Sequence, residues 1–236
     1  MSRLRVGIFV LFAVLAAALF ARLGIWQLHR LAERRARNAL VVSRLDSVEV
    51  PLAKLPRDTA QSRFRRVRFV GVPDYAQELI LAARTHNGAP GVDLITPIRV
   101  VGNDTAVLLN RGWVYSPDAA SIYEDRWREH DSVFVGYAET MPTEGGVPYR
   151  SRPHTITRLT MATARAALPY PVFPFYVVEM GDTTVAAGRP ERVGVPPLDE
   201  GPHKSYAIQW FFFALVALVG AAIVVSNARR PKNQGT

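Results

Sequence analysis

Two long apolar runs lie near the ends of the chain, and the sequence between them mixes apolar and polar residues. The first run covers residues 6–23 and continues to Trp26, and the second covers residues 206–225. About 20 residues of helix span the hydrocarbon core of a bilayer. The second run carries no charge, and the first carries only Arg22. The pattern predicts a hairpin of two transmembrane helices with a domain between them.

The residues after the first run keep a helical pattern, because Leu28 and Leu31 recur at helical spacing among charged residues. We expect an amphipathic extension whose arginines form a solvated face. Glu33 and Arg37 are four residues apart, in the order that favours an ion pair. We divide the chain into a cytoplasmic N-terminus (1–5), a first transmembrane helix (6–28), an amphipathic helical extension (29–44), an extracytoplasmic domain (45–203), a second transmembrane helix (204–226) and a basic cytoplasmic tail (227–236).

The middle of the chain has the period-two alternation of short strands. In the first of them, Val67 and Phe69 alternate with Arg66 and Arg68. We expect strands at residues 64–72, 78–83, 92–101, 105–114, 132–139 and 172–180. We expect short helices from residue 116 and over 160–168, a loop over 141–153, and an edge or bulge at Pro174. The fold class is a membrane protein with an extramembrane α+β domain, mostly antiparallel, for which a barrel is one arrangement.

Charge and composition exclude several classes of protein. The 236 residues include 29 Lys and Arg against 20 Asp and Glu, a net charge of +9. Nucleic acid is one partner for such a chain, but the arginines that flank the apolar runs have a sufficient partner in the lipid bilayer. We therefore expect no nucleic-acid binding. The chain has no cysteine, which excludes disulfides, thiolate metal sites and c-type haem attachment.

The flanking charges alone do not orient the hairpin. Five basic residues lie beside the spans on each side: Arg3, Arg5, Arg229, Arg230 and Lys232 against Arg30, Arg34, Arg35, Arg37 and Lys204. A long loop translocates largely regardless of its charge, and the basic tail is a clear stop signal. We expect both termini in the cytoplasm of a bacterial-type cell. A cleaved signal peptide ending at Ala18 is the alternative, but the apolar run continues past that residue.

The sequence lacks the GxSxG, HExxH and phosphate-loop motifs of common enzyme classes. Its histidines are more informative, because a hairpin brings His29 and His203 to the same membrane interface. Imidazole is an axial ligand of haem iron, and a groove between two helices can hold a planar apolar group. The alternative is that each is an interfacial amphipathic residue with no ligand.

Aromatic and polar residues near the spans have two interpretations each. Trp26, Tyr206 and Trp210 can stack on a cofactor or form the aromatic belt of a membrane helix. Gln27 and Gln209 can hydrogen-bond across the helix pair. Residues 110–114 (NRGWV) end a strand, and their Trp113 is a buried ring or part of a docking surface.

Several motifs together resemble those of the Surfeit-locus-one (SURF1) family, the assembly factors of haem–copper cytochrome c oxidase. Residues 23–30 match its LGxWQxxR signature, residues 110–114 its NRGWV strand end, and residues 203–211 its HxxYAxxWF start of the second span. Two shorter motifs of the family also match: its GxxD motif at Gly71 and Asp74, and its glycine followed by Thr-Pro at Gly91 and Thr96-Pro97. The matches run in order over nearly the whole chain.

The resemblance implies an action on cytochrome c oxidase subunit I, at or near the insertion of haem a. It implies that His203 is the axial ligand of a transiently bound haem a, and that Lys204 pairs with a propionate. The other motif residues are Trp26, Gln27, Arg30, Arg111, Trp113, Tyr206 and Trp210. His29 lies at a variable position of the signature, so its role rests on the hairpin geometry alone.

Three hypotheses about function remain open at this point. The first is a non-enzymatic chaperone that presents or stabilises haem a, with the haem A synthesis machinery as a further partner. The second is a scaffold that assembles the oxidase by protein contact alone, with Gln27, Arg30, Arg111 and Trp113 as contact residues. The third is a membrane-anchored extracytoplasmic enzyme, which would be active in the isolated domain.

Overall fold

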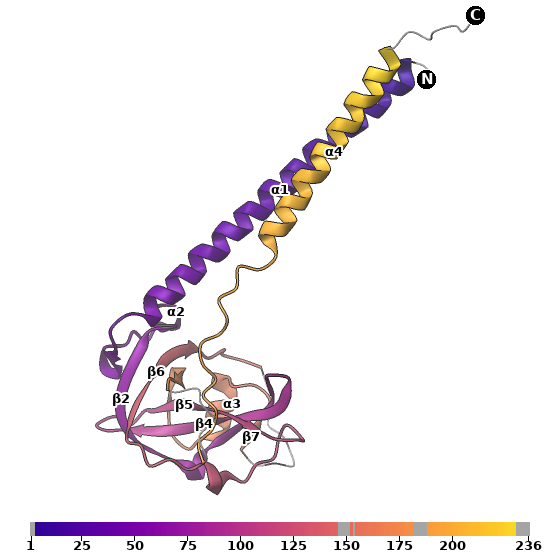
Figure 1. The fold of residues 1–236 in the computed structure, drawn as a ribbon. Coiled ribbons are helices and arrows are strands. Elements are labelled where there is room, and N and C mark those ends of the chain that lie inside the picture. Colours follow the sequence, from indigo (N-terminus) through magenta and orange to yellow (C-terminus); the bar gives the residue numbers. More distant parts are fainter. Residues whose placement is uncertain (1–2, 146–151, 153, 182–187, 230–236) are drawn as a thin grey trace, which may run out of the picture. The chain divides into compact units, whose positions relative to one another are not determined.

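The computed structural model describes residues 3–145, 152, 154–181 and 188–229 (Figure 1). Most of the loop expected over residues 141–153 and of the basic tail lies outside these residues. The chain forms two compact units, one made of Met1–Leu40 with Pro197–Thr236 and the other of Val41–Pro196. We call them the helix pair and the barrel domain.

The helix pair contains α1 (Arg3–Leu45) and α4 (His203–Arg229), and both are long and apolar enough to cross a membrane. The two candidate spans were predicted from the apolar runs. Because its second half is rich in Leu, Ala, Arg and Glu, which favour helix, α1 continues without a break to Leu45. The points at which the chain enters and leaves a membrane stay predictions.

Small residues line the contact between α1 and α4. The least exposed positions recur three and four residues apart, which is the spacing of a packed helix seam. On the two helices they are Ala13, Ala17, Phe20, Gly24, Gln27 and Leu31, and His203, Ala207, Trp210, Ala214, Ala217 and Ala221. Small side chains let two helices approach closely, which favours association in lipid. The helices run antiparallel, since Gln27 contacts His203 whereas Phe20, earlier in α1, stacks on Trp210, later in α4, with ring centroids 5.7 Å apart.

The barrel domain is one mixed sheet. Its strands are β1 (Val50–Pro51), β2 (Arg66–Pro73), β3 (Leu79–His86), β4 (Ala89–Val100), β5 (Ala106–Tyr115), β6 (Val133–Thr140), β7 (Thr155–Ile156) and β8 (Val172–Glu179). Their order is β1-β2-β6-β8-β5-β4-β3-β7, and pairing of β2 with β4 closes a barrel of β2, β6, β8, β5 and β4. Most pairs are antiparallel; β1–β2, β3–β7 and β5–β8 are parallel. The predicted α+β class and the barrel are confirmed.

Alternation along the strands produces the core. On β2, Val67 and Phe69 are buried among the residues of the largest apolar cluster, whereas Arg68 points to solvent. A second cluster packs β3, β4 and β5 against α3 (Met161–Ala167). The predicted helix over residues 160–168 is confirmed, and a capping box of Thr160 and Thr163 begins it.

Two local predictions differ from the structure. No helix begins at residue 116, because the Asp118 carboxylate accepts hydrogen bonds from the backbone of Ala120 and Ser121 and closes a turn instead. The nearest helical turn is η3 (Glu124–Trp127). Pro174 is not on an edge strand, since β8 lies between β5 and β6. It lies where the β5–β8 register shifts, so the bulge was the correct alternative.

The remaining short helices connect the strands. They are η1 (Leu52–Lys54), α2 (Thr59–Ser62) and η2 (Tyr75–Gln77). The Asp58 side chain caps α2 by accepting a hydrogen bond from the backbone of Ala60. Past β8, residues 188–196 run extended and join the barrel through a bridge between Trp113 and Glu191. We call residues 188–196 the strap.

Candidate functional site

His203 and Gln27 meet where the apolar seam of the helix pair ends. The ring Nδ1 of His203 lies 2.8 Å from the side-chain Oε1 of Gln27, which is buried. An amide oxygen only accepts, so Nδ1 carries the proton and donates. In the tautomer that this hydrogen bond selects, the lone pair lies on Nε2. A ring nitrogen oriented in this way by its partner nitrogen is typical of metal-ligating histidines.

Side chains of α1 hold the linker that leads to His203. The Arg35 guanidinium makes a two-pronged contact with the Glu200 carboxylate, at 2.6 and 2.8 Å. Arg34 donates to the carbonyl oxygen of Asp199, and Asn38 donates to the carbonyl oxygens of Leu198 and Asp199. These contacts fix residues 198–200 along α1; we call them the latch.

The latch corrects part of the sequence interpretation. Arg34 and Arg35 are contact residues of the linker and not only a solvated face. Glu33 pairs with Arg30 at 2.7 Å, where an ion pair with Arg37 was predicted. The hydrogen bond from Arg35 lowers the pKa of the exposed Glu200 carboxyl, and the charges of Arg35 and Lys204 act in the same direction.

The other predicted residues of the helix pair lie in different places. Trp26, Lys204 and Tyr206 are exposed on the outside of the pair, and Trp210 is half-buried against Phe20. The exposed rings therefore do not stack on each other.

His29 is exposed and does not face the seam. It follows the buried Gln27 by two residues, which is about 200° around a helix, and it points away from α4. The structure therefore does not bring His29 and His203 together, and a role of His29 in binding a cofactor stays a prediction. Arg30 is also exposed and makes its ion pair within α1.

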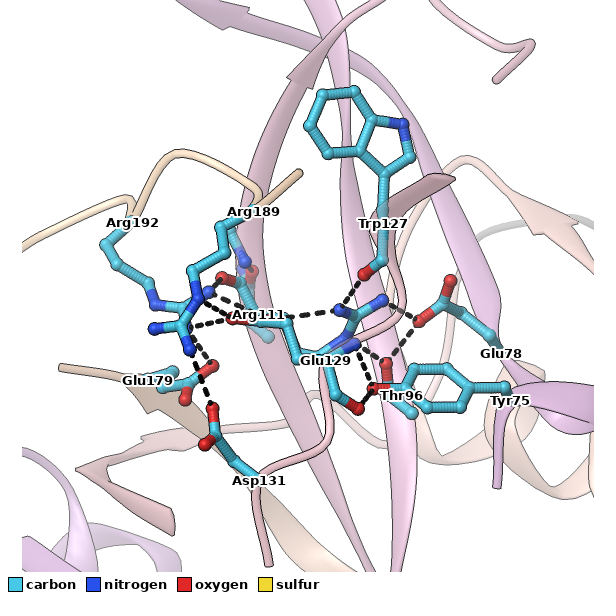
Figure 2. A network of polar contacts seen from close by, with 12 residues as sticks. Tyr75, Glu78, Thr96, Arg111, Trp127, Glu129, Asp131, Glu179, Arg189 and Arg192 are labelled. Carbon is cyan, nitrogen blue, oxygen red and sulfur yellow. Dashed lines mark hydrogen bonds and ion pairs between the residues drawn. The ribbon is translucent and has the colours of Figure 1, made fainter. Parts of the chain in front are cut away.

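Arg111 is the centre of a buried polar network in the barrel domain (Figure 2). Its side chain is 1% exposed. It donates to the carboxylates of Glu78 and Glu129, to the hydroxyl of Thr96 and to the backbone oxygen of Trp127. The Tyr75 ring lies 5.0 Å from the guanidinium carbon. The network therefore joins β4, β5, the residue just before β3 and the loop around residue 128.

Arg192 brings the strap into this network. It donates to the Arg111 carbonyl oxygen and, at 2.8 Å, to Glu129, and it forms an ion pair of 3.2 Å with Glu179. The Tyr137 hydroxyl donates to the backbone oxygen of Gly194, further along the strap. The two arginines thus hold the barrel and the strap together through the carboxylate of Glu129, which they share.

Burial changes the pKa values of the charged groups in the network. Burial alone would lower the pKa of Arg111, but the charges of Glu78, Tyr75 and Glu129 raise it, so the guanidinium stays protonated. Burial raises the pKa of Glu179 to about 7, although Arg192 acts in the opposite direction. The cluster therefore holds buried charges that depend on one another.

Trp113 packs in the interior beside this network. A methyl group on Gly91 would overlap the indole ring, and the His86 ring lies 5.5 Å away. Arg111 and Trp113 are both buried, so neither side chain forms exposed surface in this structure, and their role in docking a partner stays a prediction. The alternative of a buried ring was correct.

Sequence reasoning missed the partners of Arg111. Glu78, Glu129 and Arg192 belong to segments far from it in the chain, with separations of 33 residues for Glu78 and 81 for Arg192. A signal for the wider network existed in Glu179, an acidic residue at the end of the apolar strand β8 that pairs with Arg192. Within the described residues, no group of three or more His, Cys, Asp or Glu is placed to hold a metal ion.

Comparison with known proteins agrees with the motifs. The sequence model of the SURF1 family matches residues 14–215, which include part of each apolar run and the whole domain between them. The chain belongs to the SURF1 family. This family is known broadly as oxidase assembly factors and is not a recognised enzyme class.

Its SURF1-like relatives come from distant organisms. A SURF1-like protein of Monosiga brevicollis is 26% identical over 212 residues, which cover 83% of this chain and 79% of the relative. An uncharacterized SURF1-like protein of Mycobacterium bovis is 27% identical over 231 residues, covering 92% and 83%. A SURF1-like protein of Rickettsia felis is 25% identical over 206 residues, covering 84% and 88%. The similarity thus extends over the helices and the barrel domain together.

Proposed function

We propose that this SURF1 chain is a membrane-bound assembly factor for haem–copper cytochrome c oxidase that assists the insertion of haem a into subunit I. The observation that carries the proposal is the hydrogen bond from His203 Nδ1 to Gln27, which leaves Nε2 as the free ligand atom. The two apolar helices suggest a membrane anchor. In the proposed topology both termini are cytoplasmic and the barrel domain is extracytoplasmic.

The residues around His203 fit one axial position of a haem. Haem a, when bound, supplies a redox-active iron in a large apolar ring. Gln27 keeps the imidazole in the tautomer that a metal needs, and the exposed rings of Trp26 and Tyr206 offer apolar surface. Lys204 supplies a positive charge for a propionate, in competition with Glu200. No second histidine of the helix pair is available, since His29 points away.

A second candidate function is a scaffold that binds no haem. The observation that favours it is the seam, in which Ala17, Ala207 and Ala214 are buried between the helices. A seam of such small residues leaves no room for the macrocycle that the sequence placed between the helices. In this case subunit I would be recognised by contact alone, and His203 with Gln27 would serve to join the helices.

The absorption spectrum of the purified full-length protein separates the two functions. The protein is co-expressed with the haem A synthesis enzymes and compared with His203→Ala and with the matched control His29→Ala. We expect a stoichiometric haem a spectrum in the wild type and in His29→Ala, and its loss in His203→Ala. No haem in folded wild-type protein, together with oxidase assembly in cells that carry His203→Ala, would establish the scaffold instead.

A further inference from the structure

A group of exposed valines lies on the outside of the barrel domain. Their side chains are between 44% and 87% exposed: Val48, Val70, Val72, Val101 and Val133. On β2 the outward positions normally carry polar residues, and Arg66 and Arg68 follow that rule. The next two outward positions carry apolar residues instead, Val70 and Val72. Contiguous exposed aliphatic surface on a folded domain is typical of an interaction site.

Three of these valines, Val48, Val70 and Val101, line a groove in the wall of the barrel. Val70 lies directly opposite Val133 across the β2–β6 pair, and the Val101 backbone nitrogen donates to the Val70 oxygen at 3.2 Å. The groove has a volume of about 700 Å³, and the core residues Leu52 and Phe69 contribute to its lining. It opens where β2 leaves β1, after Arg68, and joins β4, from Gly71 onward. The split between neighbouring strands thus brings the edge of the apolar core to the floor of the groove, although Leu52 and Phe69 are themselves buried.

The two arginines that line the groove differ in whether they form an ion pair. Arg66 forms an ion pair of 2.6 Å with Glu49. Arg68 is exposed beside the valines, and it has no ion-pair partner in the part of the chain that the structure describes. The site therefore offers an apolar floor with one free guanidinium, which is suited to a carboxylate that arrives with aliphatic neighbours.

We propose that this groove docks a segment of a partner protein in which a carboxylate, paired with Arg68, is flanked by aliphatic side chains. A second copy of this chain is a poor occupant, because a symmetric contact would bring Arg68 against its own copy. Anionic lipid attracts clusters of unpaired cations, whereas this groove presents one. The inference does not depend on haem binding by the helix pair.

Photo-crosslinking in native membranes tests the proposal. A benzoylphenylalanine is placed at Val101 in the full-length chain at its natural expression level, and the crosslinked peptide is identified by mass spectrometry. We expect a partner peptide with Asp or Glu among aliphatic residues. The same probe at Tyr123, which is exposed on the loop beyond β5, controls for non-specific reaction and should not give this product.

Charge variants decide whether the pairing is real. Arg68→Glu should lower the yield of the Val101 product by about tenfold, the size expected for a lost charge-assisted contact. Arg128→Glu, which alters an exposed arginine paired with Asp125, should leave the yield unchanged. Thermal unfolding of the purified variants confirms that both are folded.

Each result has a defined meaning. Products with lipid alone or with a second copy, or a yield that Arg68→Glu does not change, would overturn the docking surface. A charge-dependent product with an oxidase subunit would support the docking surface and the proposed function together. A charge-dependent product with another protein would support the surface and argue against the proposed function.

Discussion

At the scale of single residues, the clearest feature is how much depends on Arg111. Its guanidinium contacts two carboxylates, and all three side chains are at most 5% exposed. A buried ion pair contributes modest net stability when complete, but removal of one partner leaves an uncompensated charge. Its importance is therefore structural, because it holds β5 to the segments that carry Glu78, Glu129 and the strap.

The variant Arg111→Leu tests this role. We expect it to lower the free energy of unfolding by about 3–5 kcal/mol, because Glu78 and Glu129 stay buried without their partner. Arg128→Leu breaks an exposed ion pair with Asp125 and should cost at most about 1 kcal/mol. Urea unfolding of the full-length protein in detergent measures both, and equal losses would contradict the network.

A second residue-scale prediction concerns Asp93, whose carboxyl lies in β4 beside Asn110. Burial raises its pKa from 3.8 to about 6, against the opposing charge of Arg84. As the pH rises from 4 to 6, the unfolded chain loses this proton before the folded one, so the folded state loses stability. The loss is complete above pH 6 and amounts to about 3 kcal/mol.

Asp93→Asn removes this titration and keeps an oxygen that accepts from Asn110. Its stability relative to the wild type should therefore rise by up to about 3 kcal/mol between pH 4 and pH 7. Chemical unfolding at a series of pH values measures the difference. Parallel curves for the two proteins would show that burial does not raise this pKa.

At the scale of elements, the sequence predicted what depends on periodicity and missed what depends on contacts between distant segments. The alternation of Val67 and Phe69 with Arg66 and Arg68 identified β2 correctly, because each face of a strand meets one environment. The turn at Asp118 was taken for a helix start, since Ser-Pro-Asp suits both. The role of Arg35 was missed, because its partner Glu200 is 165 residues away.

The latch makes a prediction about the linker before α4. Arg35→Glu should release residues 198–202, because it replaces the contact with Glu200 by repulsion. Amide hydrogen exchange of Gly201, whose N–H donates to the Asp199 carboxylate within this linker, should become about tenfold faster, which is the size of a lost two-pronged ion pair. The charge swap Arg35→Glu with Glu200→Arg should restore slow exchange.

Arg37→Glu is the matched control, since Arg37 is exposed on the same turn of α1 and makes no contact in the latch. It should leave the exchange of residues 198–202 unchanged. Fast exchange in the wild type, or equal effects of the two variants, would show that the latch does not hold the linker. The measurement needs no haem and is independent of the proposed function.

At the scale of the whole molecule, the chain divides its tasks between two units. The helix pair carries His203 with Gln27, and the barrel domain carries the Arg111 network and the valine groove. The apolar runs and the motif order predicted this division. They did not reveal that the NRGWV motif is internal, because burial of Arg111 depends on carboxylates from two other segments of the domain, Glu78 and Glu129.

The division predicts how separate parts of the chain behave. Residues 41–196 contain the closed barrel, its apolar clusters and the strap with Arg192. Expressed alone, this fragment should therefore unfold cooperatively in urea. Arg111→Leu should lower the urea concentration at the midpoint, as it does in the full chain.

Under the proposed function the same fragment should bind no haem a, because His203 and Gln27 lie outside it. Haem bound by the fragment would move the haem site into the barrel domain, and a fragment that fails to fold would show that the helix pair supports the barrel.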